Sequence, residues 1–224
     1  MVIRHFDEEL DELKQTLLRM AAKAESMIHD SIQALVKRDP TMGDRILQLE
    51  DEVNRLQLEI DDRAFKLLAL QQPMAHDLRF IIAAMKISSD LERIADQAVN
   101  ITENTKILLQ FPELKPLIDI PKMAEITKAM VRDSLDAYVD SNAPKAREVV
   151  VRDDTVDALK DQVFREVLTY MISDPRTIQV GLQLILVARH LERIADHATN
   201  IAEDVVYMVE VKDIRHHSEE QQES

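Results

Sequence analysis

Two segments one hundred residues apart carry the same pattern of acidic residues. LERIADQAVNI occupies residues 91–101 and LERIADHATNI occupies residues 191–201, and 10 of the 13 positions in 91–103 are identical in 191–203. At 100° per residue on a helix, four oxygen-bearing side chains of each copy fall within about 80° of one another. They are Glu92, Asp96, Asn100 and Glu103 in the first copy and Glu192, Asp196, Asn200 and Glu203 in the second. Apolar residues lie on the opposite side, so both stripes are expected to face solvent.

Acidic side chains at this spacing favour the binding of cations. Carboxylates four residues apart repel each other by roughly 0.2–0.5 kcal/mol per pair unless a cation or an arginine intervenes, and Arg93 and Arg193 are candidates for that role. A second short stripe adds oxygen ligands in each half, namely Asp51 with Asn54 and Asp154 with Asp157. Because the chain has no cysteine, such ligands suit hard or borderline cations, which include magnesium, calcium, manganese and iron.

A solvated helix face is the simpler interpretation of such a stripe. Most charge patterns at helical spacing serve only solubility. Solubility needs polar residues but no particular ones, so the return of Glu, Asp, Asn and Glu in the same order favours a binding function. His190 and His197 lie about 160° and 140° from the stripe, and we expect them at the edge of the core or on the surface rather than among the ligands.

Composition and breaks in periodicity predict a chain made only of helices. Among 224 residues there are two glycines and seven prolines, 46% of the residues are hydrophobic and 4% are aromatic. Such a chain has little turn chemistry for a many-stranded sheet and abundant helix formers. Proline, glycine and asparagine breaks divide it into six expected helices. Four of them are expected at about 6–37, 44–71, 75–109 and 122–141. The fifth follows a break at Asn142-Ala143-Pro144 and runs to about 172, and the sixth spans about 177–212.

The two halves of the chain repeat one three-helix plan. A shift of 103 positions aligns residues 50–54 with 153–157 without a gap, and a shift of 100 aligns the third helices. The pattern predicts an all-α fold of two pseudo-symmetric three-helix bundles that arose by internal duplication. The predicted bounds are 1–115 for the first bundle, 116–212 for the second and 213–224 for a flexible polar tail.

Charge and hydropathy exclude several classes of function. A net charge of −14 and a pI near 4.9 oppose binding to nucleic acid or to an anionic membrane surface, because both need basic clusters. The longest strongly apolar stretch, GLQLILVA at 181–188, is too short to span a bilayer, and the first residues hold no apolar signal core. A cytoplasmic protein without membrane insertion is therefore expected. No surface stripe is apolar enough to predict an interface.

Known catalytic motifs are missing from the sequence. There is no G-x-x-x-x-G-K-[ST] phosphate loop, no G-x-S-x-G elbow and no Glu-x-x-His pair of the kind that di-metal bundle enzymes use. We therefore expect a protein that is not an enzyme and has no catalytic residues. Two alternatives stay open: a metal-dependent helical carboxylate enzyme, and a purely structural helical adaptor whose acids serve only solubility.

The chain resembles the PhoU family, the accessory and regulatory proteins of the phosphate-specific transport system. The resemblance runs nearly end to end and rests on E-x-x-x-D at Glu92/Asp96 and Glu192/Asp196, on the hairpin stretches 67–79 and 167–178, and on NIAEDVVYMV at 200–209. It implies a negative regulator of phosphate uptake and of phosphate-starvation (Pho regulon) signalling. Such a regulator couples the ATP-binding subunit of the phosphate ABC transporter to a sensor histidine kinase. The resemblance also implies a homodimer.

Some members of that family carry multinuclear metal clusters at the acidic motifs, iron among others. The resemblance implies divalent or trivalent ions, with manganese, magnesium, calcium and zinc as alternatives to iron. By that pattern Glu92, Asp96, Asn100, Glu103, Asp51 and Asn54 serve one site. Glu192, Asp196, Asn200, Glu203, Asp154 and Asp157 serve the other. Since Asn54 stands where the second half has Asp157, we expect the two sites to differ and the first to be weaker.

Overall fold

Six long helices make up the protein in the computed structural model, which describes residues 2–214, with side-chain surroundings from residue 6 onward. They are α1 (Val2–Lys37), α2 (Met42–Gln71), α3 (Ala75–Leu108), α4 (Asp119–Val139), α5 (Ala143–Ser173) and α6 (Ile178–Glu210), with a short 3₁₀ turn η1 (Pro175–Thr177) before α6. No strand occurs among the described residues, so the all-α prediction is confirmed. Of the predicted tail, residues 215–224 lie outside the described part.

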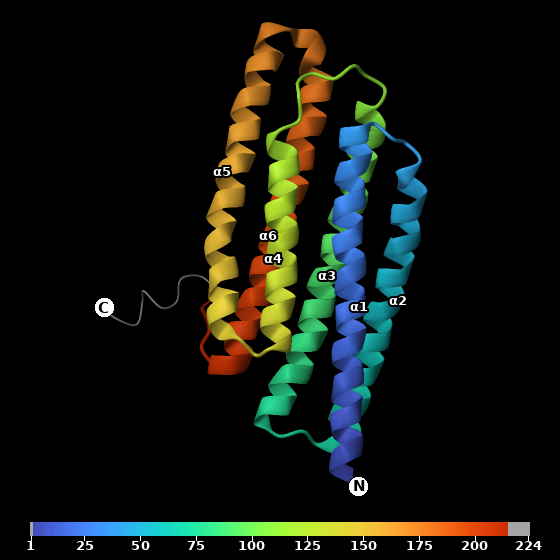
Figure 1. Cartoon of the computed structure of the whole chain (residues 1–224), viewed down its shortest axis with the longest axis vertical. Coiled ribbons are helices and arrows are strands. Elements are labelled where there is room, and N and C mark those ends of the chain that lie inside the picture. The colour runs from blue at the N-terminus through green and yellow to red at the C-terminus, as the bar shows by residue number, and fades with distance from the viewer. Residues whose placement is uncertain (1, 215–224) are drawn as a thin grey trace, which may run out of the picture.

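The helices form two antiparallel halves that lie side by side (Figure 1). Helices α1, α2 and α3 pack together as the first bundle, and α4, α5 and α6 form the second. The halves meet mainly where α3 packs on α6, and α1 adds a smaller contact with α4. The α2–α3 hairpin and the α5–α6 hairpin therefore lie at opposite ends of the molecule (Figure 1). This arrangement confirms the prediction of two pseudo-symmetric three-helix bundles.

Two polar pairs mark the pseudo-twofold axis between α3 and α6. His190 Nδ1 lies 2.8 Å from Gln97 Oε1, and His197 Nδ1 lies 2.9 Å from Asp90 Oδ1. Positions 90 and 190 correspond in the repeat, and so do positions 97 and 197. Exchanging the two halves therefore converts one pair into the other. The duplicated motifs thus face each other at the centre of the molecule.

A single hydrophobic cluster runs through both halves. The motif residues Leu91, Ile94, Leu191 and Ile194 have no exposed surface, and burying a side chain of this size contributes about 1.5–3 kcal/mol. Across the boundary between the halves, Tyr138 of α4 stacks on Phe80 of α3 with a ring-centroid distance of 4.6 Å. The Tyr138 hydroxyl also donates a hydrogen bond to the Phe80 carbonyl oxygen at 3.2 Å. Both motif helices are therefore held rigidly against the core.

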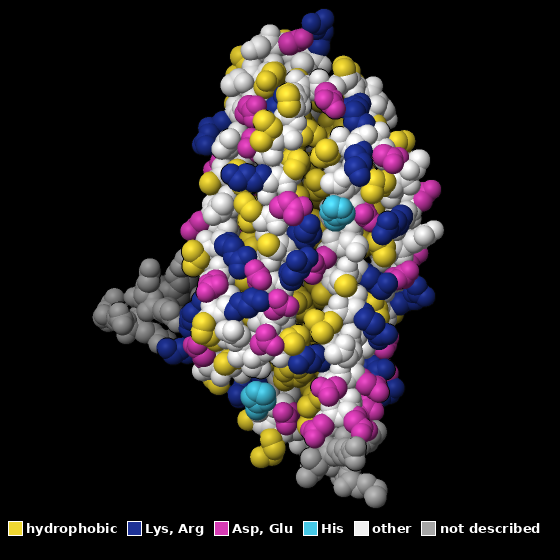
Figure 2. Space-filling model, viewed as in Figure 1, with side chains coloured by type: hydrophobic (Ala, Val, Ile, Leu, Met, Phe, Trp, Pro, Cys, Tyr) yellow, Lys and Arg dark blue, Asp and Glu magenta, His cyan; other side chains and the backbone are white. Residues whose placement is uncertain are grey.

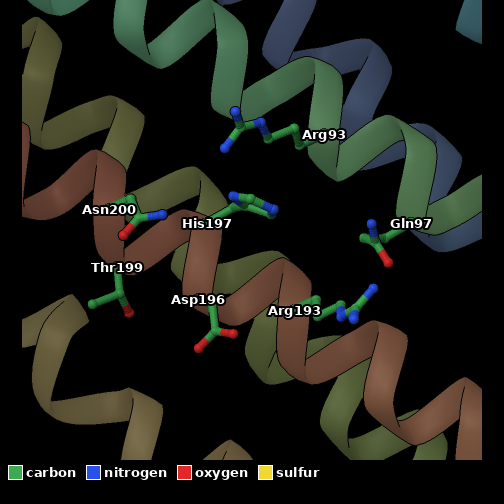
Figure 3. A pocket seen from close by; sticks show the side chains of 7 residues that line it. All are labelled: Arg93, Gln97, Arg193, Asp196, His197, Thr199 and Asn200. Atoms are coloured by element: carbon green, nitrogen blue, oxygen red, sulfur yellow. The ribbon is translucent and has the colours of Figure 1, made fainter.

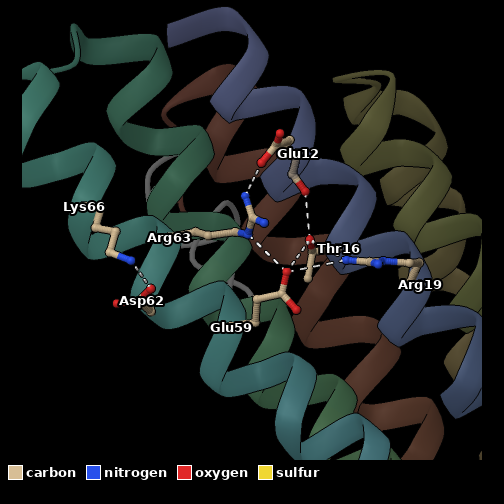
Figure 4. A network of polar contacts seen from close by, with 7 residues as sticks. All are labelled: Glu12, Thr16, Arg19, Glu59, Asp62, Arg63 and Lys66. Carbon is tan, nitrogen blue, oxygen red and sulfur yellow. Dashed lines mark hydrogen bonds and ion pairs between the residues drawn. The ribbon is translucent and has the colours of Figure 1, made fainter. Parts of the chain in front are cut away.

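Acids along the seam between α1 and α2 are neutralised by arginines (Figure 4). The Glu59 carboxylate accepts a hydrogen bond from Arg63 Nε at 3.1 Å and lies 3.5 Å from Arg19 Nη2. Arg63 also forms an ion pair with Glu12, and the Thr16 hydroxyl reaches Glu59 Oε1 at 3.5 Å. Glu12 and Glu59, two acids that join the helices along this seam, are each paired with an arginine.

Large hydrophobic side chains are exposed at the tips of both hairpins. The α2–α3 tip exposes Phe65, Met74, Leu78 and Ile82, and the α5–α6 tip exposes Leu168, Ile172, Ile178 and Leu182. Figure 2 shows hydrophobic side chains toward the end of the molecule where α5 and α6 join and again along the middle of that face, with Lys, Arg, Asp and Glu side chains mixed around them. The sequence indicated no apolar surface stripe on any single helix, whereas each of these tips combines exposed residues from two helices. No helix in the described range is both long and apolar enough to cross a membrane.

Candidate metal sites

The predicted acids of the first half come together along the seam between α2 and α3. Asp51 and Asn54 lie on α2, while Glu92, Asp96, Asn100 and Glu103 lie on α3. Glu50 of α2 connects the two rows, because Asp96, Asp51 and Glu103 all lie close enough to raise the pKa of its carboxyl. We call this set, with Glu50 included, the first acidic face.

Carboxylates of the first acidic face hold protons more tightly than free acids do. Partial burial, followed by the charge of Asp96, raises the pKa of Glu92, and Arg93 opposes this only in part. Partial burial also raises the pKa values of Asp96 and, together with neighbouring acids, of Glu50. None of these carboxylates forms an ion pair with a basic side chain in the described part of the chain. Within the described part of the chain their mutual repulsion is therefore only partly compensated.

The second acidic face follows the same plan along the seam between α5 and α6. It consists of Asp153, Asp154 and Asp157 on α5 and Glu192, Asp196, Asn200 and Glu203 on α6. Partial burial and then the charges of Asp196 and three other acids raise the pKa of Asp153 to about 6. Unlike the first face, this one contains a lysine: Lys160 Nζ lies 2.8 Å from Asp157 Oδ1 and 3.2 Å from Glu192 Oε1.

The prediction missed three residues of these faces. Glu50 and Asp153 occupy equivalent positions in the repeat, and each approaches the third helix of its own half. The repeat alignment could have found both, since it places an acid at each position. Lys160 gave no such signal, because its equivalent is Gln57 and a lysine on a helix surface is ordinary in sequence terms.

Two expectations about the surroundings of the stripes need correction. Glu92 and Asp96 are half-buried against α2 rather than fully solvated, because the neighbouring helix covers one side of the stripe. Arg93 and Arg193 make no ion pair with the acids of either face within the described chain. Each is displaced by about 100° from its glutamate, which turns it toward the other half.

These arginines line a cleft of about 540 Å³ between α3 and α6 (Figure 3). Gln97, Asp196, His197, Thr199 and Asn200 complete its lining. Figure 3 shows Arg93 reaching toward His197 of the opposite helix, whereas Asp196 points away from Arg93. The arginines of both motifs thus lie at the α3–α6 seam, and of the motif acids Asp196 also contributes to the lining of this cleft. His190 and His197 are held at this α3–α6 seam by their hydrogen bonds.

The donor chemistry of both faces suits an oxygen-loving cation. Carboxylates dominate, amides of Asn54, Asn100 and Asn200 add neutral oxygens, and each set comes from two adjacent helices. No group of three or more His, Asp or Glu side chains among residues 6–214 converges tightly enough to form a ready-made cage. Such a site would bind a cation through side-chain adjustment and bound water, as calcium and magnesium sites commonly do.

Fold and faces together define a class: duplicated six-helix proteins that present one acidic face on each hairpin. The PhoU domain model matches residues 17–105 and again 120–205. The chain therefore belongs to the PhoU family, as its resemblance to that family predicted.

Relatives cover nearly the whole chain. A phosphate-specific transport system accessory protein PhoU homolog of Caulobacter vibrioides is 43% identical over 90% of this chain and 88% of its own length. A protein of the same description from Clostridium acetobutylicum is 39% identical over 96% of this chain and 98% of its own length. These proteins are named as accessory proteins and not as enzymes.

Solved structures agree with the fold. The crystal structure of PhoU from Pseudomonas aeruginosa matches with a TM-score of 0.88 at 35% identity, over 92% of this chain and 100% of that one. The phosphate transport system regulatory protein PhoU from Streptococcus pneumoniae matches with a TM-score of 0.85 at 30% identity, over 93% and 99%.

Proposed function

We propose that this protein is a non-catalytic regulator of phosphate transport. The observation that carries the proposal is the match of both halves to the PhoU domain model, together with relatives named as accessory proteins over nearly their full lengths. In this proposal it acts in the cytoplasm and restrains phosphate uptake and phosphate-starvation signalling. It does so by contacting both the ATP-binding subunit of the phosphate transporter and a sensor histidine kinase.

Two docking surfaces at opposite ends of the molecule support a coupling role. Met74 at the α2–α3 tip is 79% exposed and Ile172 at the α5–α6 tip is 75% exposed, and each belongs to a group of exposed apolar residues at its tip. Such groups are typical of protein interaction sites. Because the tips lie far apart along the rod (Figure 1), one molecule can contact two partners without steric conflict. Association into a homodimer is part of the proposal and would use the same kind of surface.

Metal binding at the acidic faces is the second part of the proposed function. Its support is the set of half-buried carboxylates with raised pKa values and no basic partner on the first face. A bound divalent or trivalent ion, with iron and manganese the leading candidates and magnesium, calcium and zinc the others, would supply the missing positive charge. The carboxylates of adjacent helices would then be held together, which would stiffen the hairpins that carry the docking tips.

Affinity capture from phosphate-replete cells tests the docking proposal. The full chain should enrich the transporter's ATP-binding subunit and the kinase, and Met74→Asp or Ile172→Asp should each reduce the recovery of at least one of them about tenfold. Val151→Asp is the matched control, because Val151 is 71% exposed on α5 but belongs to neither tip. Enrichment of neither partner by the wild-type chain would reject the coupling role. Sedimentation velocity on the same variants reports the dimer.

Elemental analysis tests the metal proposal separately. Protein purified without chelator should carry metal, and the double variant Asp96→Asn/Asp196→Asn should lose most of it, since each substitution removes a charged ligand from one face. Equal metal content in both proteins would favour the purely structural adaptor.

A further inference from the structure

Lys160 lies inside the second acidic face. Its ammonium group contacts Asp157 on its own helix at 2.8 Å and Glu192 on α6 at 3.2 Å, and Asp161 lies 4.0 Å away. About 29% of its side-chain surface is exposed, so the charge is held in place rather than moving freely in solvent. The lysine thus joins the two acidic helices at the position where a bound cation would join them.

The equivalent position in the first half holds the neutral residue Gln57. The basic residues near the first face do not replace the missing lysine. Arg55 of α2 donates a hydrogen bond from Nε to the backbone carbonyl oxygen of Asp51 at 3.3 Å and forms no ion pair with the described carboxylates of the face. Arg93 lowers the pKa of Glu92 electrostatically but lines the α3–α6 cleft instead of the α2–α3 seam. Lys106 packs its side chain against Gly43, beyond the end of the acidic row. No ion pair bridges α2 and α3 across the first face within the described chain.

We propose that Lys160 is a built-in counter-ion that makes the second acidic face a poor metal site, so that metal binds preferentially at the first face. The inference rests on the metal-binding part of the proposed function. It reverses the sequence-based expectation that the first site is weaker. Asp157 does add a carboxylate that Asn54 lacks, but Lys160 takes up that carboxylate and that of Glu192. A metal ion entering there would have to displace an ammonium group already in contact with two acids.

Exchanging the two residues tests this directly. Manganese(II) is titrated into chelator-treated full-length protein by calorimetry, for wild type, Lys160→Gln, Gln57→Lys and the double exchange. Wild type should show one tight class of site, which Asp96→Asn removes and Asp196→Asn leaves unchanged. Lys160→Gln should tighten the second face by about tenfold or more, since net ligand charge sets affinity. Gln57→Lys should weaken the first face by a similar factor, and the double exchange should move the tight class to the second face.

A readout without metal keeps the lysine's role testable on its own. In chelator, Lys160→Gln should lower the melting temperature by about 2–4 °C, because a loss of about 1 kcal/mol has that effect in a chain of this size. Added manganese should restore it. Equal manganese affinity at both faces of wild type, or a Lys160→Gln variant unchanged in both assays, would overturn the inference while leaving metal binding intact. Absence of manganese binding in every variant would overturn both the metal-binding proposal and the preference for the first face. If the melting temperature of Lys160→Gln were also unchanged, the role of Lys160 as a counter-ion would be rejected too.

Discussion

The two acidic faces have nearly the same motif but differ in whether a basic side chain offsets the repulsion between their carboxylates. Along α2 and α3 the carboxylates face one another with no basic side chain between them, whereas Lys160 bridges α5 and α6. Both copies keep the buried side of the motif, and Leu91 and Leu191 are equally inaccessible. Duplication therefore preserved the packing of the motif helices, and the halves diverged in what neutralises their acids.

The interiors of the halves differ in the placement of glycine. Gly181 lies where α6 crosses α5, and its repeat equivalent is Ile81. Gly43 lies at the start of α2, and its equivalent is Ala146. The first half has the large side chain of Ile81 at the position where the second half has Gly181. The helices of the two hairpins therefore pack through side chains of different size, although the order of the helices is the same.

The largest expected effect tests whether the halves are equally important to the core. Ile94→Ala and Ile194→Ala each remove a fully buried side chain, and each should lower the free energy of unfolding by about 2–5 kcal/mol. Urea denaturation followed by circular dichroism measures both. Because one cluster spans the molecule, each variant should still unfold in one transition. Two separate transitions in either variant would show that the halves are independent units.

Gly181 provides the next test. A Cβ atom at this position would lie 2.8 Å from Met171 Cγ and 2.9 Å from Val167 Cγ1, closer than carbon atoms approach. Gly181→Ala should therefore cost about 1–2 kcal/mol, since overpacking outweighs the gain of about 1 kcal/mol in helix propensity. Gly43→Ala is the control: its Cβ would lie 3.3 Å from the flexible Lys106 side chain and 3.5 Å from Thr102 Cγ2, an ordinary contact distance. A gain of about 0.5 kcal/mol is expected. Similar denaturation midpoints for the two variants would refute this difference between the hairpins.

Asp153 provides a pH-dependent contrast in metal-free protein. Burial and neighbouring acids raise its pKa from 3.8 to about 6, so the folded state binds the proton more tightly than the unfolded state. Stability should therefore rise as the pH falls from about 7 toward 4, and be lost again as the pH rises through 6. Asp153→Asn should stabilise the protein by about 1 kcal/mol at pH 7, after allowance for solvent screening, and should flatten this dependence. A variant whose melting temperature varies with pH as steeply as that of wild type contradicts the assignment.

Helix boundaries were predictable wherever a proline or glycine coincided with the end of the apolar periodicity. The breaks after Lys37 and Gln71 were placed correctly to within a residue. The start of α4 was expected at about residue 122, directly after Pro121, but α4 begins at Asp119. Proline is well tolerated in the first turn of a helix, where its missing N–H has no intrahelical partner. The last helix ends two residues early because Val211 adopts a left-handed conformation with φ 59°.

The residues of the candidate site that follow from the periodicity of a single helix were predictable. The stripes on α3 and α6 follow from 100° spacing, and the repeat drew attention to them. Glu50, Asp153 and Lys160 depend on the register between two helices, which periodicity does not determine. The same limit explains why the apolar tips were missed, since neither helix of a hairpin has a broad exposed apolar stripe of its own.

Helix caps provide the smallest and most specific contrast between the halves. Asn142 caps α5, because its side-chain oxygen accepts a hydrogen bond from the Lys145 backbone N–H at 3.0 Å. Thr41 precedes α2 without a side-chain cap, and its hydroxyl donates instead to Asp39 at 2.7 Å. Asn142→Ala should therefore cost about 0.5–1 kcal/mol, and Thr41→Ala should cost clearly less. Hydrogen exchange of the first-turn amides is the sharper measurement, because protection should fall at the start of α5 in Asn142→Ala and stay unchanged at the start of α2 in Thr41→Ala. Equal losses at both helix starts would mean that the caps are interchangeable and that this difference between the repeats has no energetic consequence.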